Sequence, residues 1–316
     1  MKQEKIYKIA VRKKSSPNDF FWEQKDFQFE ECSINTAGKY WLADPFVFEK
    51  DGGLYIFFEA FDLVNSIGKI GYSKRLDNGT FTHPKIIIDK KYHMSFPHIF
   101  EYEGDIFIMP ESCGDWRVRL FKAKLFPDIW EEADILLPDV YACDSIIIDA
   151  KDRKWLLTNE MYHNPPVDSY VSCWVKNYLY EMNGLKIINS GTKVAEGDFG
   201  IRNAGKSFWL NNRQYRVGQD CRNKQYGRGL ALFEIESFVP YKEKMLWSKD
   251  CKDIAPHIKR HNSSEIIGVH TYNGSEHWEV IDYSHMSCIP FNLKMKRLHR
   301  LIRIAMAPFF RKFKSN

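Results

Sequence analysis

A short hairpin pattern recurs along the chain, and this repeat constrains the fold more than any other feature of the sequence. The first copy covers residues 41–59, where two apolar runs flank a Lys-Asp-Gly-Gly turn, with Asp44 near its start and Glu59 at its end. Such a turn between apolar runs is typical of a β-hairpin. Because the start and the end of an antiparallel hairpin lie at the same edge, these two carboxylates are expected at one rim of the unit.

Further copies follow at intervals of about 50 residues. They cover residues 97–111, 144–160 and 202–220 and, more loosely, 256–282. Strand-pair repeats of this length are typical of propeller blades, and the periodicity of a helical solenoid is missing. The sequence therefore predicts an all-β fold, a five-bladed β-propeller over residues 1–291, whose N-terminal strand completes the last blade. The polar stretch 13–40 is expected to be a loop.

The tail, residues 292–316, differs from the rest of the chain. From Asn292 to Asn316 apolar residues fall near helical spacing with lysines and arginines between them, and no acidic residue follows Asp282. Eight of the 46 lysines and arginines lie here, which leaves 38 in the remainder against 41 acidic residues. The tail is predicted to be a basic amphipathic helix. It suits an anionic membrane surface, or alternatively the surface of the body or of a partner subunit.

Composition excludes several classes of protein and site. The seven cysteines are scattered without a C-x-x-C motif, so we expect neither a disulfide framework nor a zinc site. No signal peptide and no apolar run of about 18 residues is recognisable, which favours a cytoplasmic protein, at most peripheral at the inner face of the membrane. No metal, cofactor or nucleic-acid partner is expected, because Asp-x-Asp and G-x-G-x-x-G motifs are missing and no aromatic residues alternate with a basic face.

Three carboxylates from separate copies are the candidate catalytic residues. The inner strand ends of propeller blades meet around the central axis, so Asp44, Glu111 and Asp144 are expected to share one pocket. Clustered carboxylates repel, and their pKa values separate into those of an acid and a base, as glycosyl transfer or hydrolysis requires. The residues expected to bind substrate are Glu59, His98, Glu160, Arg202, Arg216, Gln219, Asp220, His270 and Tyr272. The alternative is that these groups hydrogen-bond neighbouring blades and hold the ring together.

Two arginines and one His-x-Tyr pair have more specific interpretations. Arg202 and Arg216 could clamp a phosphate or carboxylate in bidentate fashion, or could form ion pairs between blades. His270 and Tyr272 could supply an imidazole and a stacking ring to the pocket, or could be core residues.

Several short blocks resemble the N-terminal domain of glucosamine inositolphosphorylceramide transferases and its stand-alone bacterial relatives, over roughly residues 40–285. The blocks are Ala43-Asp44-Pro45-Phe46, Phe96-Pro97-His98, Pro110-Glu111, Arg202-x-Ala204-Gly205, Tyr215-Arg216-x-x-Gln219-Asp220-Cys221 and His270-Thr271-Tyr272. The first block is also similar, more distantly, to the first-blade motif of five-bladed propeller glycoside hydrolases, whose Asp-Pro aspartate is a nucleophile or base. The resemblance implies a glycan-building context, such as surface polysaccharide or glycolipid synthesis.

These observations favour a carbohydrate-active, glycosyltransferase-like enzyme that uses a sugar or nucleotide-sugar and a lipid-linked glycan acceptor. Asp44 is expected to be the base or nucleophile, Glu111 the acid, and Asp144 a partner that tunes pKa values or binds sugar. A glycoside hydrolase of the same fold and a non-catalytic glycan-binding propeller are the alternatives.

Overall fold

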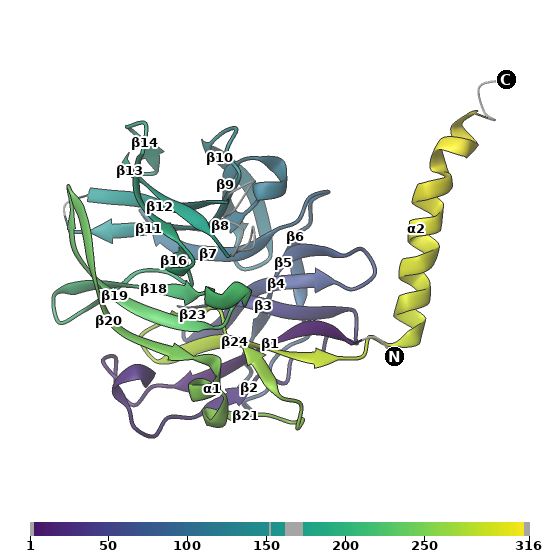
Figure 1. Cartoon of the computed structure of the whole chain (residues 1–316), viewed down its shortest axis with the longest axis horizontal. Coiled ribbons are helices and arrows are strands. Elements are labelled where there is room, and N and C mark those ends of the chain that lie inside the picture. Colours follow the sequence, from purple (N-terminus) through teal and green to yellow (C-terminus); the bar gives the residue numbers. More distant parts are fainter. Residues whose placement is uncertain (1–2, 152, 162–172, 313–316) are drawn as a thin grey trace.

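The structure, a computed structural model, describes residues 3–151, 153–161 and 173–312. It consists of five β-sheets arranged around a common centre, with one helix projecting from the side (Figure 1). The predicted five-bladed β-propeller is confirmed.

Four blades follow one another in sequence. Blade I contains β3 (Tyr40–Lys50), β4 (Gly53–Asp62), β5 (Ile67–Lys74) and β6 (Lys85–Ile88), from inside to outside. Blade II contains β7 (Ser95–Tyr102), β8 (Asp105–Glu111), β9 (Val118–Leu125) and β10 (Ile129–Leu137). Blade III contains β11 (Ala142–Ala150), β12 (Arg153–Met161) and β13 (Val175–Asn183), with β14 (Lys186–Ile187) and β15 (Thr192–Gly197) both on β13. Blade IV contains β16 (Phe199–Asn203) and β17 (Phe208–Leu210), both on β18 (Arg213–Asp220), then β19 (Gly229–Phe238) and β20 (Tyr241–Asp250).

Blade V joins the two ends of the propeller. It contains β22 (Ile266–Gly268) and β23 (Tyr272–Gly274), both on β24 (Trp278–Ser287), then β1 (Glu4–Lys13), β2 (Phe29–Glu31) and β21 (Ile258–Lys259). β1 pairs with β24 over its whole length, from Glu4 opposite Ser287 to Lys13 opposite Trp278. The remaining elements are the short helix α1 (Cys251–Ile254), the 3-10 turns η1 (Phe21–Glu23), η2 (Cys113–Asp115), η3 (Arg222–Lys224) and η4 (Ala255–His257), and α2 (Phe291–Lys312).

Local turn chemistry explains the repeated hairpins. Asp51 and Gly52, between β3 and β4, have φ of 50° and 71°, and Glu103 and Gly104, between β7 and β8, have φ of 51° and 82°. Two consecutive residues of positive φ favour the tight hairpin turn whose twist matches that of the flanking strands. The sequence therefore sets the strand register of these blades locally.

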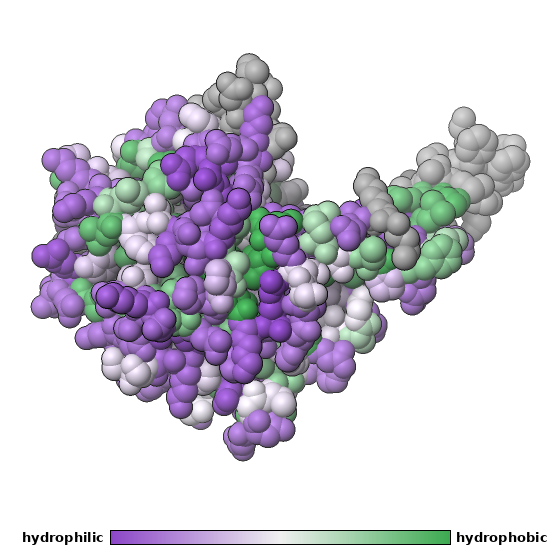
Figure 2. Space-filling model, turned by 60° about the horizontal axis from the view of Figure 1, so that its bottom comes forward, coloured by the Kyte–Doolittle hydropathy of each residue, from purple (hydrophilic) through white to green (hydrophobic). Residues whose placement is uncertain are grey.

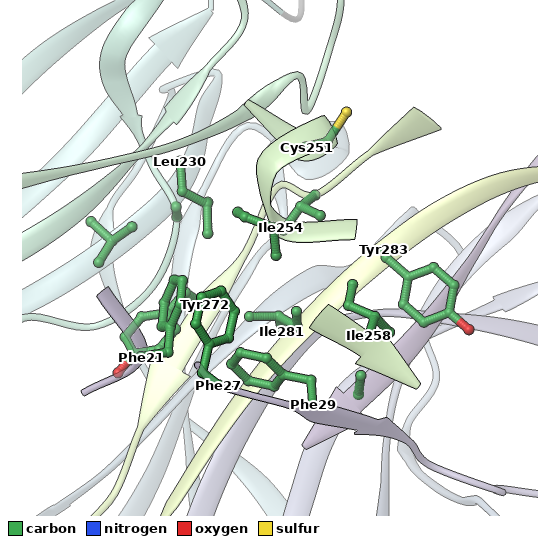
Figure 3. Close-up of a cluster of buried hydrophobic side chains, with 14 of the residues drawn as sticks. Phe21, Phe27, Phe29, Leu230, Cys251, Ile254, Ile258, Tyr272, Ile281 and Tyr283 are labelled. Carbon is green, nitrogen blue, oxygen red and sulfur yellow. The ribbon is translucent and has the colours of Figure 1, made fainter. Parts of the chain in front are cut away.

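The stretch between β1 and β2 is mostly irregular, as predicted, but part of it is buried. Phe20, Phe21 and Phe27, with Phe29 at the start of β2, are buried and pack in one cluster with Tyr272 (Figure 3). The segment therefore fills the space between blades IV and V, although no periodic pattern marks its aromatic residues.

The C-terminal helix α2 contacts the body at its start. Leu293 is buried against Leu63 and Ile289, and Arg297 Nη1 lies 3.3 Å from a carboxylate oxygen of Glu4. Beyond this root the helix projects away from the propeller (Figure 1). Among the described residues no helix combines the length and the hydrophobicity needed to cross a bilayer. Residues 313–316 of the predicted tail lie outside the described residues.

Candidate functional site

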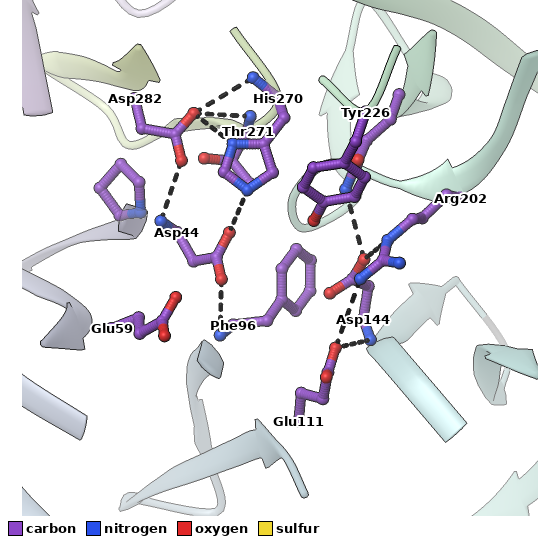
Figure 4. Close-up of polar contacts among 12 residues, drawn as sticks. Asp44, Glu59, Phe96, Glu111, Asp144, Arg202, Tyr226, His270, Thr271 and Asp282 are labelled. Carbon is purple, nitrogen blue, oxygen red and sulfur yellow. Dashed lines mark hydrogen bonds and ion pairs between the residues drawn. The ribbon is translucent and has the colours of Figure 1, made fainter. Parts of the chain in front are cut away.

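Four inner strands bend at the same point, where their pairing register shifts. The residues at the bends are Asp44, Phe96, Asp144 and Gly200, with φ of 48°, 44°, 44° and 70°. A positive φ costs a non-glycine residue about 1–3 kcal/mol, so neighbouring groups must hold the three side-chain-bearing positions in place. The bulges turn Asp44, Phe96 and Asp144 toward the propeller centre (Figure 4).

Carboxylates from one blade hold the bulges of the next. Asp44 N–H donates to Asp282 of blade V at 3.0 Å, and Phe96 N–H donates to Asp44 at 3.2 Å. Asp144 N–H donates to Glu111 of blade II at 3.3 Å. These contacts satisfy backbone groups that leave the ladder at the bulges, so the carboxylates have a structural role whatever else they do.

One half of the centre is a histidine between two aspartates. His270 Nε2 lies 3.1 Å from Asp44 Oδ1, and His270 Nδ1 lies 2.8 Å from Asp282 Oδ1. Burial alone would lower the pKa of His270, but Asp282 and Asp44 outweigh burial and raise it to about 9. Burial raises the pKa of Asp44, while the His270 cation opposes the rise. At neutral pH the imidazolium therefore stabilises negative charge on this side.

Glu59 lies beside Asp44 and is buried. Its Oε1 accepts no hydrogen bond from the residues that the structure describes, and His93 Nε2 lies 3.4 Å away. Burial, followed by the charge of Asp44, raises the pKa of Glu59 well above its usual value. The environment of Glu59 therefore favours its neutral, protonated form.

The other half contains two carboxylates around one guanidinium. Arg202 Nε donates to Asp144 Oδ2, and Arg202 Nη2 lies 3.6 Å from Glu111 Oε2. Gln219 Nε2 donates to the same Asp144 oxygen at 3.3 Å. Burial raises the pKa of Asp144 to about 7, with Arg202 lowering it and Glu111 raising it. Asp144 therefore gains or loses a proton near neutral pH.

Two tyrosines that sequence reasoning missed lie beside these groups, and one of them, Tyr226, contacts both halves. The Tyr226 ring lies 5.0 Å from Arg202 Cζ and 5.2 Å from the His270 ring, and the Tyr7 ring lies 4.8 Å from the His270 ring. Tyr226 lies a few residues after the block that ends at Cys221, whereas nothing in the N-terminal strand distinguishes Tyr7. Asp282 was also missed as a site residue, although it ends the fifth copy of the repeat.

The structure brings most of the predicted site residues together. Those at the centre are Asp44, Glu59, Glu111, Asp144, Arg202, Gln219 and His270 (Figure 4).

Arg216, by contrast, does not reach the centre. It is fully buried within blade IV, where it donates to Glu243 at 2.5 and 2.6 Å and to the Gly200 carbonyl at 2.8 Å. The expectation that it clamps a ligand with Arg202 is therefore wrong. Its side chain instead supports the bulge at Gly200.

Three other predicted residues, Asp220, Tyr272 and Glu160, are not among these central contacts. Asp220 accepts from the Arg222 guanidinium at 2.8 Å, and the Tyr272 hydroxyl donates to Glu279 at 2.8 Å within the cluster of Figure 3. Glu160, on β12, is half-buried near the end of its strand.

His98 belongs to the aromatic lining of the inner strands. It is buried with its ring 5.7 Å from that of Phe46 and 5.3 Å from that of Phe100. Burial lowers its pKa to about 3, so it stays neutral and does not add charge to the centre.

Among the residues that the structure describes, two sets of donor atoms lie close enough to ligate a metal ion. They are Asp44, His270 and Asp282, and Glu111, Cys143 and Asp144, with the donor atoms of each set within 4.8 Å of one another. Both ring nitrogens of His270 contact carboxylates. His270 would therefore have to lose a proton before the first set could bind a metal ion. Arg202 already balances the negative charge of Glu111 and Asp144 in the second set. A metal ion there would have the same electrostatic role.

Sequence comparison identifies relatives of the propeller. Residues 29–276 match the family model described as "Glucosamine inositolphosphorylceramide transferase 1, N-terminal". Glucosamine inositolphosphorylceramide transferase 1 of Oryza sativa subsp. japonica is 31% identical over 221 residues, which cover 67% of this chain and 29% of the relative. The Arabidopsis thaliana protein of the same name is 31% identical over 210 residues, covering 62% of this chain and 25% of the relative. The chain thus spans less than a third of the length of these relatives.

Solved structures share the fold at low sequence identity. The catalytic domain of the GH62 alpha-L-arabinofuranosidase of Coprinopsis cinerea has a TM-score of 0.54 at 9% identity, covering 89% of this chain and 99% of that domain. A family 117 glycoside hydrolase from Zobellia galactanivorans has a TM-score of 0.51 at 12% identity, covering 88% and 90%. At such identities the likeness concerns the five-bladed architecture alone.

Proposed function

The chain belongs to the family of the glucosamine inositolphosphorylceramide transferase 1 N-terminal domain, and from this premise we propose that it is a glycosyltransferase-like enzyme of glycolipid or surface-polysaccharide synthesis. Its substrates would be a sugar donor with a phosphate leaving group and a lipid-linked glycan acceptor. The named relatives are transferases, and this supports the class of reaction.

The observation that carries the proposal is the arrangement of Glu111 and Asp144 around Arg202, with Asp44 across the centre. Asp144, whose pKa is about 7, can both donate and accept a proton near neutral pH, which is the property that general acid–base catalysis needs. Arg202 offers a planar cation suited to a phosphate oxygen.

In the proposed reaction Asp44 accepts the proton of the acceptor hydroxyl, whose oxygen forms a bond to the anomeric carbon of the donor. The bond between that carbon and the donor phosphate oxygen breaks, and the electron pair leaves with the phosphate. Arg202 stabilises the departing charge, and the Glu111–Asp144 pair can supply a proton to it. The His270 imidazolium contacts both Asp44 and Asp282 and favours the ionised form of each.

A substrate can reach these groups only if the side chains that bury them move. Only 5% of Asp44, 7% of Glu111 and 2% of Asp144 is exposed. The Tyr226 ring lies against both Arg202 and His270, so a substrate that reaches the carboxylates has to displace it. The same ring could then stack on a sugar.

The basic helix α2 supports a membrane-bound acceptor. Phe291, Leu298, Leu301 and Ile302 are exposed on it, although they are apolar. The helix also contains lysines and arginines and no acidic residue. We infer that α2 lies at an anionic membrane surface, where its apolar residues enter the interface and its cations contact lipid phosphates.

Incubation of the full chain with nucleotide-sugars and a polyprenyl-phosphate-linked or inositol-phosphate-containing lipid tests the reaction. We expect sugar transfer, reduced about 10²- to 10⁴-fold in Asp44→Asn and Asp144→Asn. Asp89→Asn is the matched control, because Asp89 is 55% exposed and pairs with Lys69 on the surface. Absence of transfer with every donor, or equal activity of all three variants, would refute the proposal.

A second candidate, glycoside hydrolysis, is favoured by the close approach of Glu111 and Asp144. One carboxylate oxygen of each lies within 4.8 Å of the other, and glycoside hydrolysis requires a pair of carboxyl groups at the scissile bond. Release of free sugar from an oligosaccharide, without transfer to a lipid, would identify this activity.

A further inference from the structure

A mostly apolar cavity lies where β1 and β3 meet the residues that lead into α2. Its volume is about 340 Å³, and apolar side chains including Ile6, Ile34, Leu42, Leu63 and Ile289 form its walls. An engineered apolar cavity of about 150 Å³ is large enough to bind benzene. This one therefore has room for a longer hydrocarbon.

The charged groups of the cavity wall neutralise one another. Lys8 Nζ lies 2.5 Å from Glu31 Oε1, and the Tyr283 hydroxyl donates to Glu31 Oε2 at 2.7 Å. A sugar or nucleotide would need polar partners along the wall, whereas a hydrocarbon chain needs none. The chemistry of the wall therefore favours an apolar ligand.

The cavity lies beside the root of α2. Ser287 to Pro290 line it, and α2 begins at the next residue, Phe291, which is 72% exposed. Lys294, Lys296 and Arg297 of α2 follow within two turns. Figure 2 shows hydrophobic and hydrophilic residues interleaved along the projecting helix, beside a mostly hydrophilic body. An apolar chamber and a cationic helix thus adjoin each other, as recognition of an anionic lipid requires.

Inside, one aromatic ring separates the cavity from the carboxylate centre. Tyr7 lines the cavity, and its ring lies 4.8 Å from that of His270. Trp41, also in the wall, lies 5.2 Å from Tyr7 and stacks on Phe61 at 4.4 Å.

We propose that this cavity binds the hydrocarbon chain of a phosphate-bearing membrane lipid while cations of α2 contact its phosphate. That this lipid is also the acceptor rests on the proposed function, whereas the assignment of the cavity to a hydrocarbon chain does not. We expect one occupant in the cavity, a lipid hydrocarbon chain.

The probe is dodecyl phosphate with bromine at the terminal carbon, because bromine quenches tryptophan fluorescence on contact. We expect saturable quenching of the full chain, a loss of most of that quenching in Trp41→Phe, and its retention in Trp116→Phe. Trp116 is the matched control because it is 46% exposed in blade II. Equal quenching in the two variants would overturn the proposal.

A substitution that fills the cavity with a larger side chain gives a second, independent test of binding. Ile34→Phe adds volume at a partly buried wall position, and we expect it to weaken dodecyl phosphate binding at least 10-fold. Ile129→Phe, at a 52% exposed position on β10, should bind as the unaltered chain does. Equal affinity for bromobutyl phosphate would show that phosphate alone is recognised, and this too would overturn the proposal. Chain binding without sugar transfer would support the cavity assignment and refute the proposed function.

Discussion

Arg202 of blade IV donates through Nε to the carboxylate of Asp144 in blade III, and both side chains are more than 90% buried. The same guanidinium approaches Glu111 of blade II. One cation therefore holds carboxylates from two other blades at the centre of the ring. This contact ties the stability of the propeller to the groups that we propose for catalysis.

Loss of this cation should destabilise the fold. Arg202→Gln leaves two buried carboxylates without a guanidinium, and removal of one partner from a buried ion pair costs about 3–5 kcal/mol. We expect that decrease in the free energy of unfolding in urea. Arg213→Gln is the control, because Arg213 is 64% exposed where it pairs with Glu234, and a change of about 0.5 kcal/mol or less is expected there. A loss below about 1 kcal/mol in Arg202→Gln would contradict the prediction.

Asp144 should titrate near pH 7. In a chain with ¹³C-labelled aspartate, one carboxyl signal is expected to titrate there and to be absent in Asp144→Asn. Arg202 lowers the pKa of Asp144, so Arg202→Gln should move the titration to higher pH. The prediction would be contradicted by a titration midpoint near that of exposed aspartates, or by a shift of the Asp144 titration to lower pH in Arg202→Gln.

His270 should make stability depend on pH in the alkaline range. Its pKa is about 9 in the folded protein and 6.5 without the fold. The folded state therefore keeps a proton that the unfolded chain releases, so the stabilisation is complete below about pH 6.5 and is lost as the pH rises through 9. The difference corresponds to about 3 kcal/mol. Unfolding in urea from pH 6 to 10 measures it, and His270→Gln should flatten this dependence, whereas His277→Gln, at a 55% exposed side chain, should not.

Gly205 should tolerate no side chain. A Cβ at this position would lie 1.9 Å from the Tyr272 carbonyl oxygen, a backbone atom that cannot rotate away. Gly205→Ala should therefore lower the unfolding free energy by about 3 kcal/mol. Gly114→Ala is the matched substitution, because the nearest atom to a Cβ there lies at 3.6 Å. Similar melting temperatures for the two variants would be inconsistent with the close approach of blades IV and V.

Binding of α2 to anionic vesicles should depend on its charges. Lys296→Gln with Arg300→Gln removes two cations, each worth about 1 kcal/mol at a phosphatidylserine-rich surface, so affinity should fall roughly 10- to 30-fold. Lys242→Gln with Lys252→Gln on the body should leave vesicle sedimentation unchanged. Binding that is insensitive to both pairs and to salt would exclude an electrostatic contribution from α2.

Local patterns in the sequence predict much of the propeller. The turns at Asp51–Gly52 and Glu103–Gly104 and the apolar runs beside them specify hairpins, because turn geometry and strand alternation act over a few residues. Their recurrence predicts that Asp44, Glu111 and Asp144 share one rim, and the structure does bring these three side chains to one centre.

The tertiary structure alone decided which charged groups face one another. Arg202 and Arg216 are similar in sequence context, yet Arg202 reaches Asp144 while Arg216 pairs with Glu243 inside blade IV. Tyr7 reaches His270 only because β1 closes the ring beside β24. Pairing between distant blades depends on how the sheets pack and on where buried charges find partners. Those energies arise only when the ring is closed, so no short stretch of sequence carries them.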